Sequence, residues 1–359
     1  MSARNLLLVR LDNLGDVLLC TPAFHAVRET LPEARLTLLA SPVGAQVAEL
    51  NPDLDDAIVY EGPWMDVWGQ LPQDSERERR MVDLLKERRF DGAIIFTSFR
   101  QSALPAAYMA YMADIPLRLA ASIDGAGSLL TTRHKHPEQP LVHEVERALD
   151  LVGAEGFRTS DLDLVLRVPP EERAAMRRRL RAEGLSEGGT LVVVHPGCSM
   201  PARTYPWEQF ALAADLLVGE LGYQLVLTGD TREIELVERV RCRMEHPALS
   251  MVGRASFREF AALLSLADLV VTNNTGPAHL AAAVKTPVVD LFALTNPPEQ
   301  WRPWNVPYRL LYREVPCALC YNRVCPYHQE CLAGVSPAEV AAAARELLQE
   351  AVGGRADAR

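Results

Sequence analysis

Short apolar runs alternate with longer amphipathic stretches from the first residues of the chain onward. Apolar runs bounded by polar turns are typical of buried strands, and the amphipathic stretches between them are typical of helices. The alternation predicts an α/β protein with mostly parallel sheets. The predicted strands cover residues 5–9, 35–40, 57–60, 92–97 and 117–120 in the first half, and 190–195, 224–228, 249–252, 269–272 and 288–292 in the second.

Helical patterns occupy the stretches between these strands, notably residues 17–30 and 76–89. A last helix is predicted over residues 336–351, because Ser336 is a good N-cap and Pro337 suits the first helical position. The two halves of the chain therefore each have the pattern of a doubly wound domain.

The boundary between the halves is marked by Pro169 and Pro170, which cannot lie in a central strand, and by glycines before the next apolar strand. We place a hinge in this stretch, at residues 165–190. The predicted domains are an N-terminal domain over residues 1–170, a C-terminal domain over residues 171–335, and a closing helix and tail over residues 336–359.

Length and composition agree with two folded domains. The chain has 359 residues, and about 150 residues per domain is a usual size. Disorder of the whole chain is excluded, because 48% of the residues are apolar and 23% are charged. The net charge of −10 argues against a nucleic-acid binder, which needs a basic face. It does not argue against one small site for an anionic ligand.

The apolar runs are too short for a membrane protein. The first ends at Arg10, so it forms no signal-peptide core. No stretch approaches the roughly 20 apolar residues of a membrane-spanning helix. We therefore expect a soluble cytoplasmic protein, whose contact with a membrane would be peripheral, at the inner face of the cytoplasmic membrane.

The first candidate site is the turn after the first strand, Leu11-Asp-Asn-Leu-Gly-Asp16. Ligands of open parallel sheets bind outside the carboxyl ends of strands, where this turn lies. Gly15 permits a tight turn, and Asp16 falls at the start of the next helix. Either Asp16 points into a ligand cleft or it simply caps the helix. A dinucleotide fingerprint is absent, because Gly15 is the only glycine in the turn.

The second candidate site follows the strand at residues 269–272. Thr275 is a candidate cap and Pro277 stands near the first helical position, so a helix N-terminus is predicted at the carboxyl edge of the sheet. Free N–H groups and the positive end of the helix dipole suit a diphosphate there. His279 either faces this loop or packs within the helix.

Two further loops belong to the same edge. After the first strand of the second half, Ser199 lies in a loop that allows close backbone approach, and Arg203 offers a planar fork of donors for phosphate oxygens. A lone loop arginine can also be merely solvated. After the next strand, Glu233 could accept two ribose hydroxyls. Alternatively, Asp230 or Thr231 caps the following helix and Glu233 favours its positive end.

Taken in order, the motifs at residues 11–16, 195–197, 229–233 and 274–279 resemble those of glycosyltransferase family 9, the heptosyltransferase family. The resemblance covers nearly the whole chain. It implies a GT-B fold, in which two Rossmann-like doubly wound domains face a central cleft. The acceptor would lie on the N-terminal domain and the nucleotide sugar on the C-terminal one. It also implies inversion at the anomeric carbon without a catalytic metal.

The resemblance also assigns roles to residues. Asp16 matches the family's proposed general base. Arg203 stands where the best-known members have a phosphate-binding lysine, and Asn274 stands where some have aspartate. Glu233 matches the ribose-binding glutamate. The implied donor-binding residues are Ser199, Arg203, Glu233, Asn274, Thr275, Gly276 and His279.

The leading functional hypothesis is transfer of heptose from ADP-heptose to a lipopolysaccharide-core or other surface-glycan acceptor. The alternatives are a protein or small-metabolite acceptor, or a non-catalytic nucleotide-sugar-binding protein, against which the intact Asp16 argues. Basic residues of the first domain either face an anionic lipid core or form a solvated surface. They are Arg100, Arg118, Arg133, His134, Lys135 and His136.

A metal-dependent transferase is a further class to weigh. The pairs Asp53/Asp55 and Asp161/Asp163 have a spacing that is common by chance and lie in polar connections or strand edges, so we expect no catalytic metal.

Four of the seven cysteines fall within one short segment. Four thiolates can surround one tetrahedral zinc or iron, and in a reducing cytosol a structural metal is favoured over disulfides. Free thiols are the alternative, since the spacing lacks paired zinc knuckles. His328 is a possible substitute ligand, and related transferases hold iron at cysteines. We assign these thiols no catalytic role. They are Cys317, Cys320, Cys325 and Cys331.

Overall fold

The computed structural model describes residues 3–66, 68–137 and 140–356. The chain forms two compact units, Met1–Arg167 and Val168–Arg359. The predicted closing segment is not separate, because helix α13 (Pro337–Ala356) packs against α7 (Trp207–Gly219) within the second unit. The last three residues of that segment lie outside the described residues.

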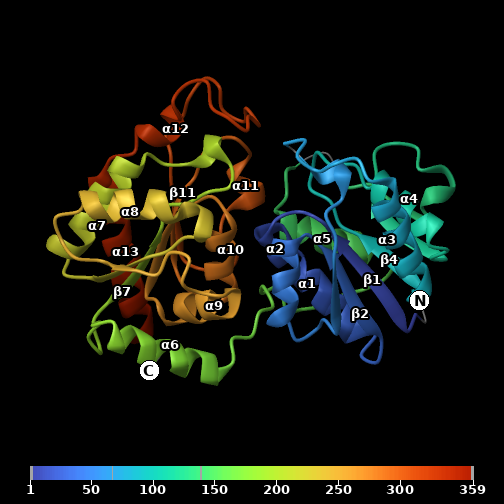
Figure 1. The fold of residues 1–359 in the computed structure, drawn as a ribbon, viewed down its shortest axis with the longest axis horizontal. Coiled ribbons are helices and arrows are strands. Elements are labelled where there is room, and N and C mark those ends of the chain that lie inside the picture. Colours follow the sequence, from blue (N-terminus) through green and yellow to red (C-terminus); the bar gives the residue numbers. More distant parts are fainter. Residues whose placement is uncertain (1–2, 67, 138–139, 357–359) are drawn as a thin grey trace. The chain divides into compact units, whose positions relative to one another are not determined.

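The first unit is built on a six-stranded sheet in which every neighbouring pair is parallel (Figure 1). The strand order is β3-β2-β1-β4-β5-β6, so the order reverses between β1 and β4. The strands are β1 (Asn5–Arg10), β2 (Arg35–Ala40), β3 (Asp56–Val59), β4 (Gly92–Ile95), β5 (Leu117–Ala121) and β6 (Thr132–His134). The helices are α1 (Leu14–Thr30), α2 (Pro42–Ala45), α3 (Ser75–Glu87), α4 (Leu104–Met112) and α5 (Glu144–Gly153).

The second unit repeats the same topology. Its parallel sheet has the order β9-β8-β7-β10-β11-β12, which reverses between β7 and β10. The strands are β7 (Leu191–His195), β8 (Gln224–Leu227), β9 (Leu249–Ser250), β10 (Leu269–Asn273), β11 (Val288–Leu291) and β12 (Tyr308–Leu311). Besides α7 and α13, the helices are α6 (Pro170–Ala182), α8 (Ile234–Arg243), α9 (Phe257–Leu266), α10 (Gly276–Ala283), α11 (Pro298–Trp301) and α12 (Glu330–Ala333).

Burial on both faces explains why the central strands are apolar throughout. Leu7 and Val9 of β1 belong to a core cluster with residues of α3 and α4. The alternate residues Leu6 and Leu8 are fully buried as well and point to the opposite face, because successive strand residues alternate. The helices α1 and α5 pack against each other in this unit. The doubly wound α/β class predicted from the sequence is confirmed in both units.

The passage between the units is short. Residues near 165 are still bonded to the first unit: Val165 donates its N–H to the Thr21 hydroxyl at 2.9 Å, and Arg167 donates its N–H to the Leu50 carbonyl at 2.8 Å. Beyond Arg167, α6 already packs against α9 of the second unit. The hinge motion expected at residues 165–190 stays a prediction.

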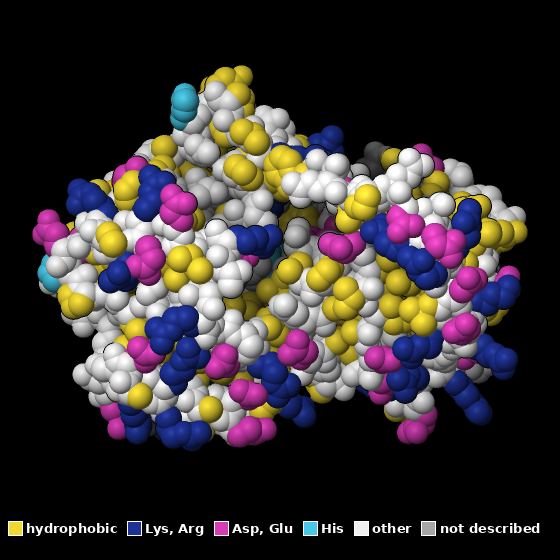
Figure 2. Space-filling view, viewed as in Figure 1, with side chains coloured by type: hydrophobic (Ala, Val, Ile, Leu, Met, Phe, Trp, Pro, Cys, Tyr) yellow, Lys and Arg dark blue, Asp and Glu magenta, His cyan; other side chains and the backbone are white. Residues whose placement is uncertain are grey.

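The surface carries charges of both signs. On the face drawn in Figure 2, Lys and Arg side chains lie among Asp and Glu side chains and do not merge into one basic surface. Within the described part of the chain, no helix combines the length and the apolar character needed to cross a membrane.

Candidate active site

The two points where the strand order reverses are the expected ligand sites of such sheets. In the first unit the loops that leave this point are residues 11–13, between β1 and α1, and residues 96–103, between β4 and α4. In the second unit they are residues 196–206, between β7 and α7, and residues 274–275, between β10 and α10. Three of the four sequence motifs, at residues 11–16, 195–197 and 274–279, therefore lie at these reversal points, whereas the motif at residues 229–233 follows the neighbouring strand β8.

Asp16 occupies the third position of α1, whose N-cap is Asn13. Its Oδ2 accepts the Asn13 backbone N–H at 3.2 Å, while its Oδ1 accepts Nη2 of Arg10 at 2.9 Å and the Ser98 hydroxyl at 3.4 Å. Asp16 therefore takes part in the helix start, from the third helical position and not as the N-cap, and its place in a ligand cleft stays a prediction. One oxygen stabilises the helix start, and the other is held by a cation and a hydroxyl from the β4 loop.

Arg10 lies between two carboxylates and is only 2% exposed. Its Nε is 2.7 Å from Oδ2 of Asp12, its Nη2 is 2.9 Å from Oδ1 of Asp16, and Nη2 also donates to the Ser98 hydroxyl at 2.6 Å. Burial raises the pKa of Asp12 to about 6, although the Arg10 charge opposes this rise. Burial alone would lower the pKa of Arg10, but the neighbouring carboxylates, Asp12 foremost, raise it above its usual value.

A second buried ion pair lies next to Arg10. Oε1 of Glu144 is 3.1 Å from Nε of Arg147, and both residues line a small cavity together with Arg10, Cys20 and His136. Burial raises the pKa of Glu144 to about 7, and the charges of Arg10 and Arg147 oppose the rise. Asp16 therefore belongs to a network in which buried guanidinium groups balance several carboxyl groups.

Sequence reasoning did not single out Arg10, Asp12, Ser98 or Glu144. A signal was available for the first two, because Arg10 and Asp12 precede Asp16 in the same strand-to-helix turn. Ser98 and Glu144 come from distant parts of the chain, and only the fold brings them to this turn.

In the second unit, Glu233 lies against the loop that follows β7. Its Oε2 accepts the Asp230 backbone N–H at 2.8 Å and lies 3.5 Å from Nε2 of His195. A Cβ added at Gly197 would lie 2.0 Å from Oε1 of Glu233, so only glycine allows this approach. The capping alternative for Asp230 and Glu233 is therefore observed. The ribose-binding role of Glu233 stays a prediction.

Asn273, the last residue of β10, binds the backbone of the loop that follows β7. This residue was not singled out from the sequence. Its Oδ1 accepts the Tyr205 backbone N–H at 2.9 Å, and its Nδ2 donates to the Pro196 carbonyl at 2.8 Å. Asn273 is fully buried. A polar residue at the end of an apolar strand, directly before the Asn274 motif, was the available signal.

Helix α10 begins at Gly276, with Thr275 as its N-cap in extended conformation and Pro277 in its first turn, as predicted. The start of the helix thus lies at the carboxyl end of β10. Asn274 and His279 are buried, at 3% and 4% exposure. Both interpretations of His279 accommodate this burial, so its role stays a prediction.

Arg203 is bound within the second unit and is not merely solvated. Its Nε donates to the Thr295 hydroxyl at 3.0 Å. Its charge also acts on Asp290 of β11, whose pKa is raised well above the usual value by complete burial, against the opposing effect of Arg203. Ser199 is exposed in the same loop as Arg203.

The basic residues proposed to face the acceptor differ in burial: some are buried or bonded to backbone carbonyls, and others are exposed. Arg118 is 9% exposed and donates to backbone carbonyls, including those of Leu129 at 2.8 Å and Ser128 at 2.9 Å. The prediction that Arg118 faces an anionic acceptor is therefore wrong, because its guanidinium ties the β5–β6 connection together. Arg133 likewise donates to two carbonyls of residues 122–123. Arg100 and Lys135 are exposed.

All seven cysteines are free. Cys325 accepts two backbone N–H groups of residues 327–329 at its sulfur, at 3.4 and 3.3 Å. Burial raises the pKa of the Cys331 thiol, and the other three cysteines of the segment add to the rise. Within the described ranges, the cysteine sulfurs do not form a group of three ligand atoms within 4.8 Å of one another.

Comparisons with known proteins agree with this architecture. The family model "Glycosyltransferase family 9 (heptosyltransferase)" matches residues 79–330. Lipopolysaccharide heptosyltransferase 3 of Escherichia coli K12 is 25% identical over 81% of this chain and 83% of its own.

Two solved structures share the fold. A glycosyl transferase family 9 protein of Veillonella parvula has a TM-score of 0.80 at 22% identity, covering 97% of this chain and 98% of its own. The ADP-heptose lps heptosyltransferase II of E. coli has a TM-score of 0.76 at 21% identity, covering 96% and 99%. This likeness shows the GT-B fold. The chain therefore belongs to glycosyltransferase family 9, the heptosyltransferase family, and is a glycosyltransferase.

Proposed function

We propose that this glycosyltransferase moves a heptosyl group from ADP-heptose to a lipopolysaccharide-core or related surface-glycan acceptor, with inversion at the anomeric carbon. The observation that carries the proposal is the carboxylate of Asp16, 14% exposed at the reversal point of the first sheet and held by the buried Arg10. The names of the heptosyltransferase relatives support the sugar and the acceptor.

In the proposed reaction, Asp16 accepts the proton of an acceptor hydroxyl. The hydroxyl oxygen forms a bond to the anomeric carbon, and the bond from that carbon to the diphosphate oxygen breaks on the opposite side. The diphosphate leaves with the electron pair. A general base of this kind contributes about 10²- to 10⁴-fold to the rate.

Arg10 and Ser98 would act as positioning residues. Both bind Oδ1 of Asp16, and Arg10 compensates the charge of the carboxylate. The arginine is itself fixed by its ion pair with Asp12 and by its burial. In this proposal, the contacts of Arg10 and Ser98 hold the carboxylate of the base in place.

The second unit would hold the donor. The N–H groups at the start of α10 and the guanidinium of Arg203 suit the developing charge of the diphosphate. Asn274 and His279 would line this site, and Ser199 would approach it from the exposed side of the loop. Glu233 would accept the ribose hydroxyls.

We propose that no metal takes part in the chemistry. The helix end and Arg203 supply the positive charge that a metal would otherwise supply. Activity should therefore persist in EDTA. Loss of activity in EDTA that Mn²⁺ or Mg²⁺ specifically restores would overturn this part of the proposal.

A structural zinc or iron at Cys317, Cys320, Cys325 and Cys331 is a separate part of the proposal. It rests on the four thiols falling within one short segment of the sequence, and three of their sulfurs would have to move closer together than the 4.8 Å within which the described residues form no cysteine group. Metal analysis of chain purified without chelator tests it. If the purified chain holds only traces of zinc and iron, the cysteines do not bind a structural metal.

The proposed acceptor is a glycolipid. A glycolipid acceptor would bring the chain to the inner face of the cytoplasmic membrane by peripheral contact. Nucleotide release should be measured with a panel of nucleotide sugars and with deep-rough lipopolysaccharide as acceptor. If nucleotide is released only with protein or small-metabolite acceptors, one of these, and not a glycolipid, is the acceptor. Donor binding without any transfer would indicate a non-catalytic protein.

The sharpest test of the site is Asp16→Asn. The variant should retain donor binding, because the donor residues lie in the second unit, while turnover falls roughly 100-fold or more. The matched control is Asp83→Asn, the same change at an exposed position of α3 in the same unit. Unchanged turnover in Asp16→Asn would remove Asp16 from the mechanism.

A further inference from the structure

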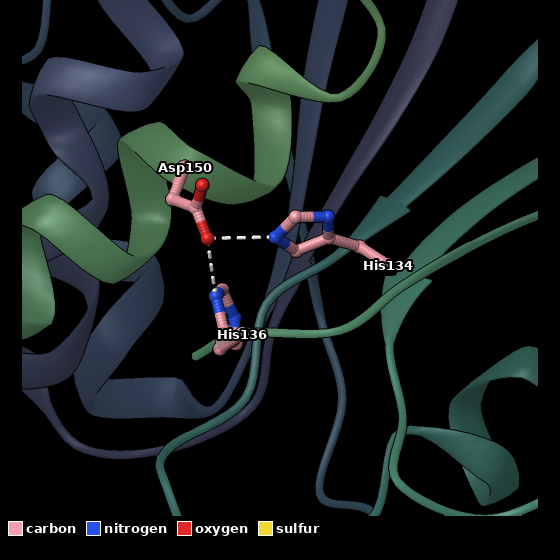
Figure 3. A group of neighbouring side chains, drawn as sticks. All are labelled: His134, His136 and Asp150. Carbon is pink, nitrogen blue, oxygen red and sulfur yellow. Dashed lines mark hydrogen bonds and ion pairs between the residues drawn. The ribbon is translucent and has the colours of Figure 1, made fainter. Parts of the chain in front are cut away.

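A second cluster of titratable side chains lies in the first unit, outside the loop of Asp16. His134 ends β6, His136 follows two residues later, and Asp150 belongs to α5. Nε2 of His134 is 2.7 Å and Nδ1 of His136 is 2.8 Å from the same oxygen, Oδ2 of Asp150. Figure 3 shows both rings directed at this one oxygen.

The local structure explains the convergence. Residues two apart in an extended segment project to the same side, so the spacing of His134 and His136 places both rings together. The rings pack edge to face, with centroids 4.9 Å apart. Asp150 reaches them from the helix that follows in sequence. Within the ranges the structure describes, these atoms form the only group of three possible metal-ligand atoms within 4.8 Å of one another.

The donor set is chemically specific. Two imidazole nitrogens and one carboxylate oxygen are ligands that zinc and similar transition metals prefer, with bonds of about 2.0–2.2 Å. Tetrahedral ligands at such distances are about 3.3 Å apart. The observed separations of 2.7 and 2.8 Å therefore need to open by only about half an ångström.

Exposure also suits an ion. The His134 and His136 side chains are 19% and 11% exposed, and so are largely fixed by their surroundings, whereas that of Asp150 is 45% exposed. The half-exposed carboxylate leaves an entry path and room for water. Without an ion, both hydrogen bonds to Asp150 require a proton on the facing ring nitrogen. An ion would displace these two protons, as metal binding generally does.

We propose that His134, His136 and Asp150 bind one divalent transition-metal ion of the zinc class, with water completing its coordination. The ion would join the edge strand β6 and the loop after it to α5. This site is distinct from the cysteine segment, which belongs to the second unit. The proposal does not rest on the proposed transferase function.

The experiment uses the full chain, without a polyhistidine tag, freed of metal by chelator. Zinc should bind in titration calorimetry, and His134→Ala/His136→Ala should lose one equivalent relative to the unchanged chain. Any metal bound at the cysteines is the same in both proteins, so it does not contribute to the difference in zinc bound between them. Cobalt distinguishes the two sites by absorption, because only thiolate ligands give a sulfur-to-cobalt charge-transfer band.

Asp150→Asn separates metal binding from a merely structural hydrogen bond. Its amide oxygen still accepts both imidazole N–H groups, so the fold should persist, but the anionic ligand is lost. Because changes outside the ligand shell alone cost 10- to 100-fold in metal affinity, we expect zinc binding at this site to weaken at least roughly 100-fold. Circular dichroism of the metal-free variants verifies that they are folded.

The matched control is His246→Ala, which removes a histidine that pairs with one carboxylate, Asp215, at 3.3 Å in the second unit. This variant should bind zinc like the unchanged chain. Equal zinc stoichiometry and affinity in the unchanged chain, His134→Ala/His136→Ala and Asp150→Asn would overturn the proposal. The cluster would then be a pair of hydrogen bonds to Asp150 and nothing more.

Discussion

Replacement of Glu144 by glutamine should make the stability of the first unit less sensitive to a rise in pH from acid to neutral. Glu144 is 4% exposed, and burial raises its pKa from 4.5 to about 7. Between these two pH values the unfolded chain ionises at Glu144 while the folded chain keeps the proton. The unfolded state is therefore increasingly favoured as pH rises from 4.5 to about 7, and the loss is complete above that range.

The magnitude follows from the two pKa values. One pKa unit corresponds to 1.36 kcal/mol, so the free energy of unfolding of the unchanged chain should fall by about 3 kcal/mol relative to Glu144→Gln across this range. For a unit of this size, 1 kcal/mol shifts the melting temperature by about 2–4 °C. The relative shift should therefore be about 6–12 °C.

Differential scanning calorimetry of the full chain at pH 5, 6, 7 and 8 measures this shift. Other titrating groups are common to both proteins and largely cancel in the difference. Glu87→Gln, at an exposed position of α3, is the control and should show no such trend. A difference between Glu144→Gln and the unchanged chain that is the same at pH 5 and pH 8 would refute the reasoning.

Three further variants test the contacts of the site. Arg10→Met leaves the buried Asp12 without its counter-charge and should cost about 3–5 kcal/mol of unfolding free energy in urea titrations; adding Asp12→Asn should restore part of it. Gly197→Ala places a methyl group against the Glu233 carboxylate. ADP affinity measured by calorimetry should therefore fall about tenfold, or 1.4 kcal/mol, and unchanged affinity would contradict a role for this contact. Asn273→Ala should destabilise the second unit by about 1–3 kcal/mol in thermal unfolding, because its buried partners lose their hydrogen bonds.

The apolar runs predicted ten strands at nearly their observed positions: the eight central strands, which lie inside their sheets, and the edge strands β3 and β9, whose short apolar runs also stand out. The strands β6 and β12 were not predicted. β6 reads Thr-Arg-His and β12 is only partly buried along its length, because each lies at the edge of its sheet. Edge strands pair on one side only, so burial imposes a weaker pattern on their residues.

The start of α1 shows a similar limit. The helix was predicted from about Asp16, the first acidic residue after the turn, but Asn13 is its N-cap and the helix begins at Leu14. Both residue types suit an N-cap. In the structure Asn13 is the N-cap, and Asp16 stands at the third helical position, where its Oδ2 accepts the Asn13 backbone N–H.

The motif residues could be placed at the carboxyl ends of strands because parallel topology sends every such end to one edge. The residues that contact these motif residues could not be predicted from the sequence. Arg10 follows an apolar run and has the pattern of a solvated charge, yet it is buried, because Asp12, Asp16 and Ser98 surround it. Glu144 lies more than one hundred residues further along the chain, and no local pattern connects it to the turn.

The identical strand order of the two sheets gives each unit one reversal point, and the two points carry opposite chemistry. The point in the first unit gathers the carboxyl groups of Asp12 and Asp16 around Arg10. The point in the second unit gathers the start of α10 and the guanidinium of Arg203. In the proposed reaction, the first set would remove the proton from the acceptor, and the second would stabilise the anionic leaving group. The net charge of −10 does not oppose this division, because backbone N–H groups and one arginine can hold a diphosphate in an acidic protein.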